Sequence, residues 1–554
     1  MADIGNASLI LALIFSVYSA VVSIANTRRG SISLAASARN ALIATFVLFT
    51  LAIEIMLYAL ITNDFDIKLV AIHSNEDMPL IYKLTALYSD KAGSLMFWGW
   101  LISIFSMVLA FQKRKTSIEM TRSATGILAA ILAFFLILIT IGLDVFEKSP
   151  LTVTDGLGQT YQHVAMVMHP LLLFLGFAGF AIVFACILGA LVLGKRGSEW
   201  IGGIRRWALF SWCTLGIANL VGAWWAWDVG NWGGYWAWDP VENAGLMPWL
   251  LGTALVHSIA IHRKRGYLKH WYIALAIFTF IFTLLSPFIT HGGLEESPLH
   301  GFDNSPVPPY ILTFIIIVLA GSLGVIVWRR RSLKDEHKPL SFISREGAFL
   351  LTNLVLVIIV LIVFLGTIIP GVAEYLGNEE VAINRGFFDK SAGPVLLALV
   401  FFMGICPLLG WRKSSPGMFR RNALFPFAAS SVAAIVVLIS GVGNWYALAA
   451  FVCGFPFFTI MQEWTRGTRA RHRTKGEYAL KAFVSLIWKN RPRYGGFIVH
   501  IGIILITIGV IGSSLHSDNS LVNLMWAGGG VLLLGAIIAF WPDRKHVQLV
   551  MRQN

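Results

Sequence analysis

Long apolar runs are the feature of this sequence that most restricts its fold. About fifteen of them follow one another along the chain, near residues 7–25, 40–62, 94–111, 123–142, 168–194, 207–227, 244–262, 271–290, 308–328, 348–369, 392–410, 423–441, 445–463, 495–512 and 523–541. A helix that crosses a bilayer needs about 20 predominantly apolar residues. Only 13% of the residues are charged, whereas about 25% is usual in soluble proteins. We therefore expect an all-α polytopic membrane protein with about 15 transmembrane helices.

One membrane domain is expected over residues 1–554, because no linker, low-complexity stretch or internal repeat divides the chain. The first apolar run is not predicted to be a cleavable signal, since no Lys or Arg precedes it. The segment between the last two runs, Ser513–Asn523, is short. No large external domain is therefore expected at that position.

Basic residues predict which helix ends lie outside. The loops after the odd-numbered runs and the C-terminal tail hold nearly all of the 43 Lys and Arg, while the opposite loops hold only Lys68, Lys83, Lys91, Lys148, Arg385 and Lys390. Loops rich in Lys and Arg stay on the cytoplasmic side. This pattern predicts an external N-terminus and a cytoplasmic C-terminus. It accounts for the net charge of +14 without a nucleic-acid partner.

The cysteines argue against two kinds of chemistry. All four, Cys186, Cys213, Cys406 and Cys453, lie within or at the ends of apolar runs, and none belongs to a CxxC or CxxCH motif. This excludes a CxxC thiol oxidoreductase and haem attached covalently to this chain. We expect buried structural thiols. The sequence also shows no phosphate-binding glycine loop, no Ser-His-Asp grouping and no zinc-ligand spacing.

A dense group of tryptophans marks the loop of residues 228–243, which we call the tryptophan loop. It is predicted to face outside, and its core contains Trp232, Gly233, Gly234, Trp236, Trp238, Asp239, Pro240, Glu242 and Asn243. Aromatic residues at a membrane surface often form only an interfacial belt. A belt requires neither the paired glycines nor the polar residues that follow. The alternative is an apolar platform for a planar ligand, with Asp239, Glu242 and Asn243 fixing the turn and capping the next helix.

Two histidines are predicted to lie inside the membrane. His257 and His500 each lie about five residues from the cytoplasmic end of a run, so both are roughly 8 Å deep at a rise of about 1.5 Å per residue. Intramembrane histidines are costly and often functional. Equal depth on two helices suits a haem iron held between two imidazoles, although two unrelated core histidines give the same spacing.

Outside the membrane, His169 and His300 are predicted to lie level with the tryptophan loop. They are candidate axial ligands of an incoming haem, and ordinary loop histidines are the alternative. His163 and His291 are rivals on the same side.

The run "WGGYWAWDPVENAGLMPWL" resembles the WWD signature of the haem-handling proteins of cytochrome c maturation. Other segments resemble landmarks of the CcmF-type haem lyases of the system I pathway, in the same order: "HSNEDMPLIYKLTALYSDKAGSLMFW", "MHPLLLFLGFAGF", "TALVHSIA", "SREGAFLLTN" and "RYGGFIVHIG". The resemblance covers roughly residues 40–512. The first of these segments begins at His73, for which we assign no role.

The resemblance implies different roles for two pairs of histidines. In such lyases a stable b-type haem is bound inside the membrane, which corresponds here to His257 and His500. A histidine pair flanking the WWD segment ligates the substrate haem, which corresponds to His169 and His300. His291 lies in Thr290–Gly293, where the family more often has Arg-Ser-Gly, so it is a rival for the iron or a contact of a haem propionate.

The implied activity is the joining of haem vinyl groups to the thiols of a CxxCH peptide in apocytochrome c. The implied partners are a CcmE-like haem chaperone, a CcmH-like thiol protein that carries apocytochrome c, and quinol as an electron source. The implied location is the cytoplasmic (inner) membrane of a bacterium or archaeon, with the active site on the outer, periplasmic face. The family usually carries a sizeable external domain between the last two helices, and its absence here puts partner docking in doubt.

Three other interpretations stay open. A system II cytochrome c synthase shares the WWD loop, but the fifteen runs and the landmarks outside that loop favour the CcmF type. A non-enzymatic haem transporter or haem-binding protein needs no external histidine pair. A lyase specialised for an unusual haem motif has the same features.

Overall fold

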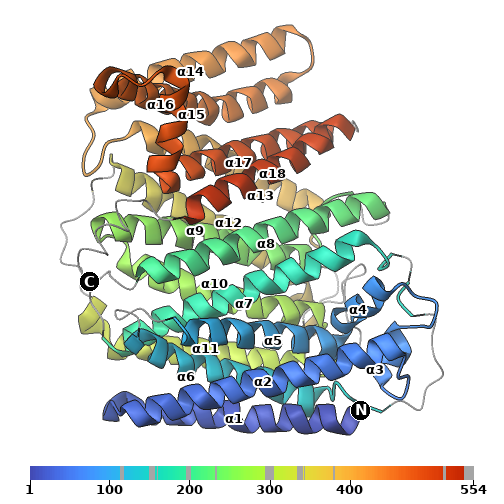
Figure 1. The fold of residues 1–554 in the computed structure, drawn as a ribbon. Coiled ribbons are helices and arrows are strands. Elements are labelled where there is room, and N and C mark those ends of the chain that lie inside the picture. Colours follow the sequence, from blue (N-terminus) through green and yellow to red (C-terminus); the bar gives the residue numbers. More distant parts are fainter. Residues whose placement is uncertain are drawn as a thin grey trace. The chain divides into compact units, whose positions relative to one another are not determined.

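The computed structural model describes residues 1–541 except 113–117, 149–155, 159, 195–200, 231–233, 294–304, 334–340, 342, 378–380 and 516–518. Within these ranges every regular element is helical, apart from an isolated bridge between Ile67 and Lys148. In chain order the elements of Figure 1 are α1 (Ala2–Arg29), α2 (Ile32–Thr62), α3 (Lys68–His73), α4 (Leu80–Ser89), α5 (Lys91–Ala110), α6 (Ile118–Ile137), the π-helical η2 (Leu138–Gly142), α7 (Val164–Val192), α8 (Ile201–Val229), α9 (Pro240–Arg265), α10 (Lys269–Thr290), α11 (Pro308–Trp328), the 3₁₀ turn η3 (Arg330–Leu333), α12 (Arg345–Tyr375), α13 (Arg385–Leu408), α14 (Pro416–Ile439), α15 (Asn444–Lys475), α16 (Ala479–Lys489), α17 (Arg491–Leu515) and α18 (Asn519–Phe540).

The predicted number of membrane helices is confirmed. In the described part of the chain, fifteen helices are long and apolar enough to cross a membrane. The predicted all-α polytopic membrane fold is therefore confirmed as well. Three further helices, α3, α4 and α16, are too short to span a bilayer.

Several helices extend beyond the apolar runs that predict them. Helix α15 continues past its apolar part to Lys475 and ends at Gly476, whose φ of 64° is left-handed. Its additional residues include Arg, Ala and Lys, which are good helix formers although Arg and Lys are charged. Apolar runs thus locate the membrane-crossing part of a helix but not its end.

The described residues divide into two compact units. Unit 1 contains residues 1–336 and 363–385, and unit 2 contains residues 337–362 and 386–554. All four cysteines have free thiols; Cys186 and Cys453 are buried, and the other two are half-buried.

Aromatic packing fills the centre of unit 1, where α5, α7, α9 and α10 have most of their membrane-crossing residues buried. Trp98 of α5 is fully buried. Its ring centroid lies 4.7 Å from that of Phe135 in α6 and 5.5 Å from that of Phe177 in α7. The Trp98–Phe135 pair is edge to face, an arrangement that adds to the free energy of apolar burial. Helix α11, by contrast, exposes most of its apolar side chains, as a lipid-facing helix does.

A stripe of glycines joins α17 and α18 in unit 2. A Cβ atom added at Gly495, Gly502 or Gly509 of α17 would lie 2.6–2.7 Å from a backbone nitrogen of α18. The same holds in reverse for Gly535, 2.5 Å from the nitrogen of Val499. Small residues at such spacing let two membrane helices approach until their backbones touch. Because His500 lies within this stripe, its helix is held firmly against α18.

Candidate haem site

The turn that leads from the tryptophan loop into α9 is held by a capping box. Asp239 is the N-cap, and its Oδ1 accepts a hydrogen bond from the backbone N–H of Val241 at 2.8 Å. Glu242 reaches back, and its Oε2 accepts hydrogen bonds from the N–H groups of Ala237 at 2.9 Å and Asp239 at 3.1 Å. Pro240 occupies the first helical turn, where the missing N–H costs little. The predicted capping by Asp239 and Glu242 is confirmed.

The side chain of Asn243 holds the backbone of the same turn in place. Its side chain is 1% exposed, and its Nδ2 donates to the carbonyl of Trp238 and to Oγ1 of Thr367 in α12, both at 3.0 Å. Trp238 has a φ of 61°, a left-handed conformation that costs a non-glycine residue about 1 kcal/mol. The hydrogen bond from Asn243 compensates for this strain, so the orientation of Trp238 is set by the fold.

Two tryptophan rings in the described part of the loop are arranged edge to face. The centroids of Trp236 and Trp238 lie 6.0 Å apart, with an interplanar angle of 88°. Tyr235 packs on Trp227 of α8 at 6.1 Å. Gly234 has a φ of 101°, which glycine adopts at little cost. Trp232 and Gly233 lie outside the described residues.

His169 lies near the start of α7, with its ring against α8. Its Nδ1–H donates to the carbonyl of Ala218 at 2.8 Å, so the lone pair of the ring is on Nε2. Protein histidines that bind a metal usually donate their other N–H in this way. A Cβ atom at Gly222 would lie 2.7 Å from Cε1 of His169, so the ring occupies space that only a glycine leaves. The Trp225 ring lies 6.2 Å away.

His163, a rival in the sequence, has both ring nitrogens engaged in structural contacts. Nδ1 accepts the N–H of Ala165 at 3.1 Å and thereby caps α7, while Nε2 pairs with Asp228 of α8 at 2.9 Å. His163 therefore joins α7 to α8 and has no ring nitrogen left for an iron. Tyr88 joins α4 to α7, because its hydroxyl donates to the carbonyl of Val167 at 3.2 Å.

His291, the other rival, ends α10 as a buried residue. It is 2% exposed, and its Nδ1 is hydrogen-bonded to Oγ of Ser305 at 2.8 Å. Burial lowers the pKa of His291 to about 4; the charge of Lys91 adds to this, and Asp90 opposes it. His291 is therefore neutral near pH 7 and offers no positive charge to a haem propionate. His300 lies outside the described residues.

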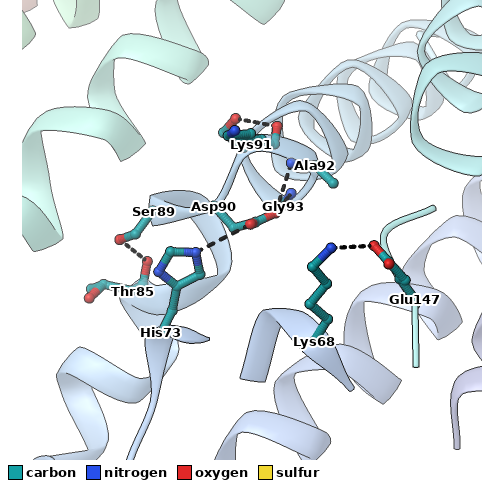
Figure 2. Close-up of polar contacts among 10 residues, drawn as sticks. Lys68, His73, Thr85, Ser89, Asp90, Lys91, Ala92, Gly93 and Glu147 are labelled. Atoms are coloured by element: carbon teal, nitrogen blue, oxygen red, sulfur yellow. Dashed lines mark hydrogen bonds and ion pairs between the residues drawn. The ribbon is translucent and has the colours of Figure 1, made fainter. Parts of the chain in front are cut away.

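Close to these residues, the side chains of His73 and Asp90 are hydrogen-bonded and join α3 to α5, and Figure 2 shows them pointing at each other. Asp90 is the N-cap of α5: its Oδ1 accepts the N–H groups of Ala92 and Gly93, and its Oδ2 lies 3.2 Å from Nε2 of His73. Burial alone raises the pKa of Asp90, but His73 and the two N–H groups outweigh burial and keep it below its ordinary value. Lys68 pairs separately with Glu147 at 2.9 Å.

His257 of α9 has the same type of support as His169. Its Nδ1–H donates to the carbonyl of Thr253, one turn earlier, at 2.8 Å. The Thr253 hydroxyl in turn accepts Nε1–H of Trp212 at 2.7 Å and donates to the carbonyl of Trp249 at 2.9 Å. The lone pair of His257 is therefore also on Nε2, so the ring can bind an iron through that nitrogen. His500 belongs to unit 2, on α17.

Several residues around these histidines were missed in the sequence. Asp90 had a usable signal, because an Asp directly before an apolar helix is a common N-cap. Gly222 and Thr367 had none, since each acts through a residue distant in the chain.

The model of the cytochrome c assembly protein family matches residues 88–294, which include the tryptophan loop. The chain is 30% identical to the cytochrome c-type biogenesis protein CcmF of Haemophilus influenzae, over 92% of this chain and 78% of that protein. It is 32% identical to CcmF of Pseudomonas fluorescens, over 99% of this chain and 82% of that protein. A solved structure of the cytochrome c haem lyase CcmF has the same fold, with a TM-score of 0.79, 23% identity and 98% coverage of both chains.

Identity of about one third, sustained over nearly the whole chain and over more than three quarters of each relative, agrees with the shared fold and with the capped tryptophan loop. This chain belongs to the CcmF family of cytochrome c biogenesis proteins.

Proposed function

We propose that this protein is a cytochrome c haem lyase of the cytoplasmic membrane whose active site faces outward. It receives haem as a substrate at the tryptophan loop and joins both haem vinyl groups to the thiols of a CxxCH peptide in apocytochrome c. Membership of the CcmF family supports the proposal. The observation that carries it is His169, whose Nδ1–H is donated to Ala218 beside the aromatic residues of α8.

Each thioether forms when a peptide S–H adds across a vinyl double bond. Sulfur bonds to the carbon next to the porphyrin, the hydrogen goes to the terminal carbon, and no group leaves. The step needs no protein nucleophile and consumes no electrons, so the contribution of the protein is positioning. We assign His169 and His300 as axial ligands of the substrate haem, one of which the histidine of the peptide replaces.

The tryptophan loop supplies the surface on which the substrate is oriented. Trp232, Trp236 and Trp238 contribute aromatic area, and Gly233 and Gly234 allow the ring to approach the backbone. Asp239, Pro240, Glu242 and Asn243 hold the turn through the capping box and the buried amide. Such preorganisation limits the motion of the bound ring, because the loop has little freedom left to lose.

His257 and His500 are assigned as the two imidazole ligands of an internal haem b. His257 suits this role, because its Nδ1–H is already donated to Thr253 and its Nε2 carries the lone pair. Bound there, haem supplies one-electron transfer that keeps the substrate iron ferrous, with quinol as the proposed electron source.

The proposed partners follow from the same chemistry. A CcmE-like chaperone delivers haem, and a CcmH-like thiol protein delivers reduced apocytochrome c. The proposed topology has the N-terminus outside and the C-terminus in the cytoplasm, which puts the tryptophan loop on the side where these partners act.

The deciding experiment measures the yield of holocytochrome c in cells that depend on this protein. His169→Ala is expected to lower the yield about tenfold or more, since loss of a group that merely supports a ligand already costs that much, and His300→Ala is expected to act likewise. His270→Gln is the control, because His270 is exposed near the start of α10, away from this site. Normal yields from both alanine variants, at normal protein levels in the membrane, overturn the proposal.

A further inference from the structure

Helix α16 is too short to cross a membrane and joins two helices that do. Its 11 residues extend about 16 Å at about 1.5 Å per residue, whereas the hydrocarbon core is about 30 Å thick. It packs against α15 and α17 within unit 2 (Figure 1), and only Asn490 separates it from α17. We conclude that α16 lies at the ends of these membrane helices, where lipid headgroups begin.

One face of α16 packs onto the protein. Ala482 is fully buried, and the Phe483 ring stacks on Trp464 of α15 with centroids 4.8 Å apart and an interplanar angle of 12°. Leu486 packs against the buried cluster that contains Trp464 and Tyr494. These contacts fix the rotation of the helix and therefore which residues its other face presents.

The opposite face carries a stripe of apolar side chains. Leu480, Val484 and Trp488 follow at intervals of four residues, which places them in a row on a helix. They are exposed by 68%, 41% and 60%. Large apolar side chains in such a row are unfavourable in water, and an amphipathic helix at a bilayer surface buries them among acyl chains.

Cationic groups surround the same face. Lys481, Lys489 and Arg491 line a surface pocket of about 440 Å³, together with Ser485 and Trp488. The guanidinium carbon of Arg491 lies 4.7 Å from the centroid of the Trp488 ring, and its Nε has no hydrogen-bond partner. Among the described residues, no carboxylate forms an ion pair with these three cations. The pocket therefore combines three positive charges and a hydroxyl next to an apolar surface.

Glu477, which precedes α16, forms an ion pair with Arg471 of α15. Nε of Arg471 donates to its Oε2 at 2.8 Å. That hydrogen bond keeps the pKa of Glu477 below its ordinary value despite the opposing effect of burial, and the charges of Arg471, Lys489 and Lys481 act in the same direction. The Glu477 carboxylate thus lowers the net positive charge near the pocket, but it is paired with Arg471 and not with the pocket cations.

We propose that this pocket binds the headgroup of an anionic phospholipid. The phosphate lies among Lys481, Lys489 and Arg491, where cations attract acidic lipids. The acyl chains lie along Leu480, Val484 and Trp488. A soluble phosphate would satisfy the cations but leave the apolar stripe in water, so the complementarity favours a lipid. The proposal does not depend on haem chemistry.

Native mass spectrometry of the full-length protein in detergent tests the site. The delipidated protein is titrated with phosphatidylglycerol and, separately, with phosphatidylcholine. Phosphatidylglycerol is expected to bind more tightly, and replacing Lys481, Lys489 and Arg491 together by Gln is expected to weaken it about tenfold or more, since each cation near a membrane contributes to attraction of acidic lipid. The single variants K481Q, K489Q and R491Q keep the test available if the triple variant does not fold.

The matched control removes the same charge from α15. Arg469, Arg473 and Lys475 are exposed and lie outside the pocket, so R469Q/R473Q/K475Q should bind phosphatidylglycerol like the unmodified chain. If both triple variants bind phosphatidylglycerol equally weakly, the attraction comes only from diffuse charge, and the proposed site is wrong. Equal binding of the two lipids, or displacement of phosphatidylglycerol by millimolar inorganic phosphate, also overturns the site.

Discussion

The imidazole of His169 lies in the space that a side chain at position 222 requires. A Cβ atom on Gly222 would come within 2.7 Å of Cε1, while the carbonyl of Ala218, one turn earlier on the same helix, accepts Nδ1–H at 2.8 Å. Two small residues of α8 therefore determine where Nε2 of His169 points. Gly222 is a positioning residue for the proposed iron ligand.

Gly222→Ala is expected to separate folding from haem handling. Alanine favours a helix interior over glycine by about 1 kcal/mol, which offsets the cost of displacing the His169 ring, so thermal stability is expected to change little. The added methyl group displaces the His169 ring, so the yield of holocytochrome c is expected to fall toward that of His169→Ala. Gly203→Ala on the same helix meets no atom within 4 Å and is expected to leave the yield unchanged. An unchanged yield from Gly222→Ala contradicts the positioning role.

The capping box of the tryptophan loop can be tested by a pair of substitutions at one position. Asp239→Ala removes the cap and is expected to cost about 1 kcal/mol of stability, together with loss of activity as the turn loosens. Asp239→Asn keeps a good N-cap and is expected to retain most of both. Melting temperature and holocytochrome yield measure the two effects. Equal activity of the two variants would mean that the order of the turn is unimportant.

The internal haem predicts a spectroscopic difference between histidines of the same helix. Purified His257→Ala and His500→Ala are expected to lose the reduced spectrum of a six-coordinate b-type haem. His262→Ala is the control, because His262 lies five residues further along α9 and therefore on a different side of the helix from His257, and its spectrum is expected to be unchanged. A spectrum that survives in His257→Ala removes the assignment.

His291 predicts a pH window in which stability declines. Its pKa is 6.5 when exposed and about 4 in the folded protein, chiefly because it is buried. Above pH 6.5 the residue is neutral in both states and stability is complete. As the pH falls from 6.5 to 4, only the unfolded chain takes up the proton, so the free energy of unfolding drops by about 3 kcal/mol in total.

The measurement is the melting temperature across that window. His291→Gln does not titrate and is expected to flatten the decline, whereas His270→Gln, which removes an exposed histidine from the other end of α10, is expected to keep it. Asp90 acts at lower pH, because its pKa is below the ordinary value near 3.8 and its contribution is lost as the pH falls through that lowered value. Identical slopes for the His291 and His270 variants argue against this assignment.

The membrane helices were predictable because their signal is local. A bilayer imposes a minimum apolar length on every crossing segment, and each such segment can be counted without knowledge of its neighbours. The caps of α9 were predictable for the same reason, since Asp239, Pro240 and Glu242 are adjacent in the sequence. Helix α16 was missed because its 11 residues are too few for a membrane span.

Contacts between helices could not be predicted from one sequence. The sequence made His163 a rival ligand of the iron. In the structure its Nε2 is paired with Asp228, a contact that the sequence does not reveal. The same applies to His169, whose support depends on Ala218 and Gly222 in another helix. These pairings depend on the register between α7 and α8, which neither hydrophobic periodicity nor loop length specifies.

The glycine stripe of α17 and α18 has a consequence for evolution by insertion. Because the two backbones touch directly at Gly502 and Gly535, the pair needs nothing from the chain that connects it, which here is residues 516–518. Lengthening a loop whose ends are already held together costs little entropy, since the cost grows only with the logarithm of its length. This hairpin can therefore accept or lose a whole module at its tip while its membrane-embedded part stays the same.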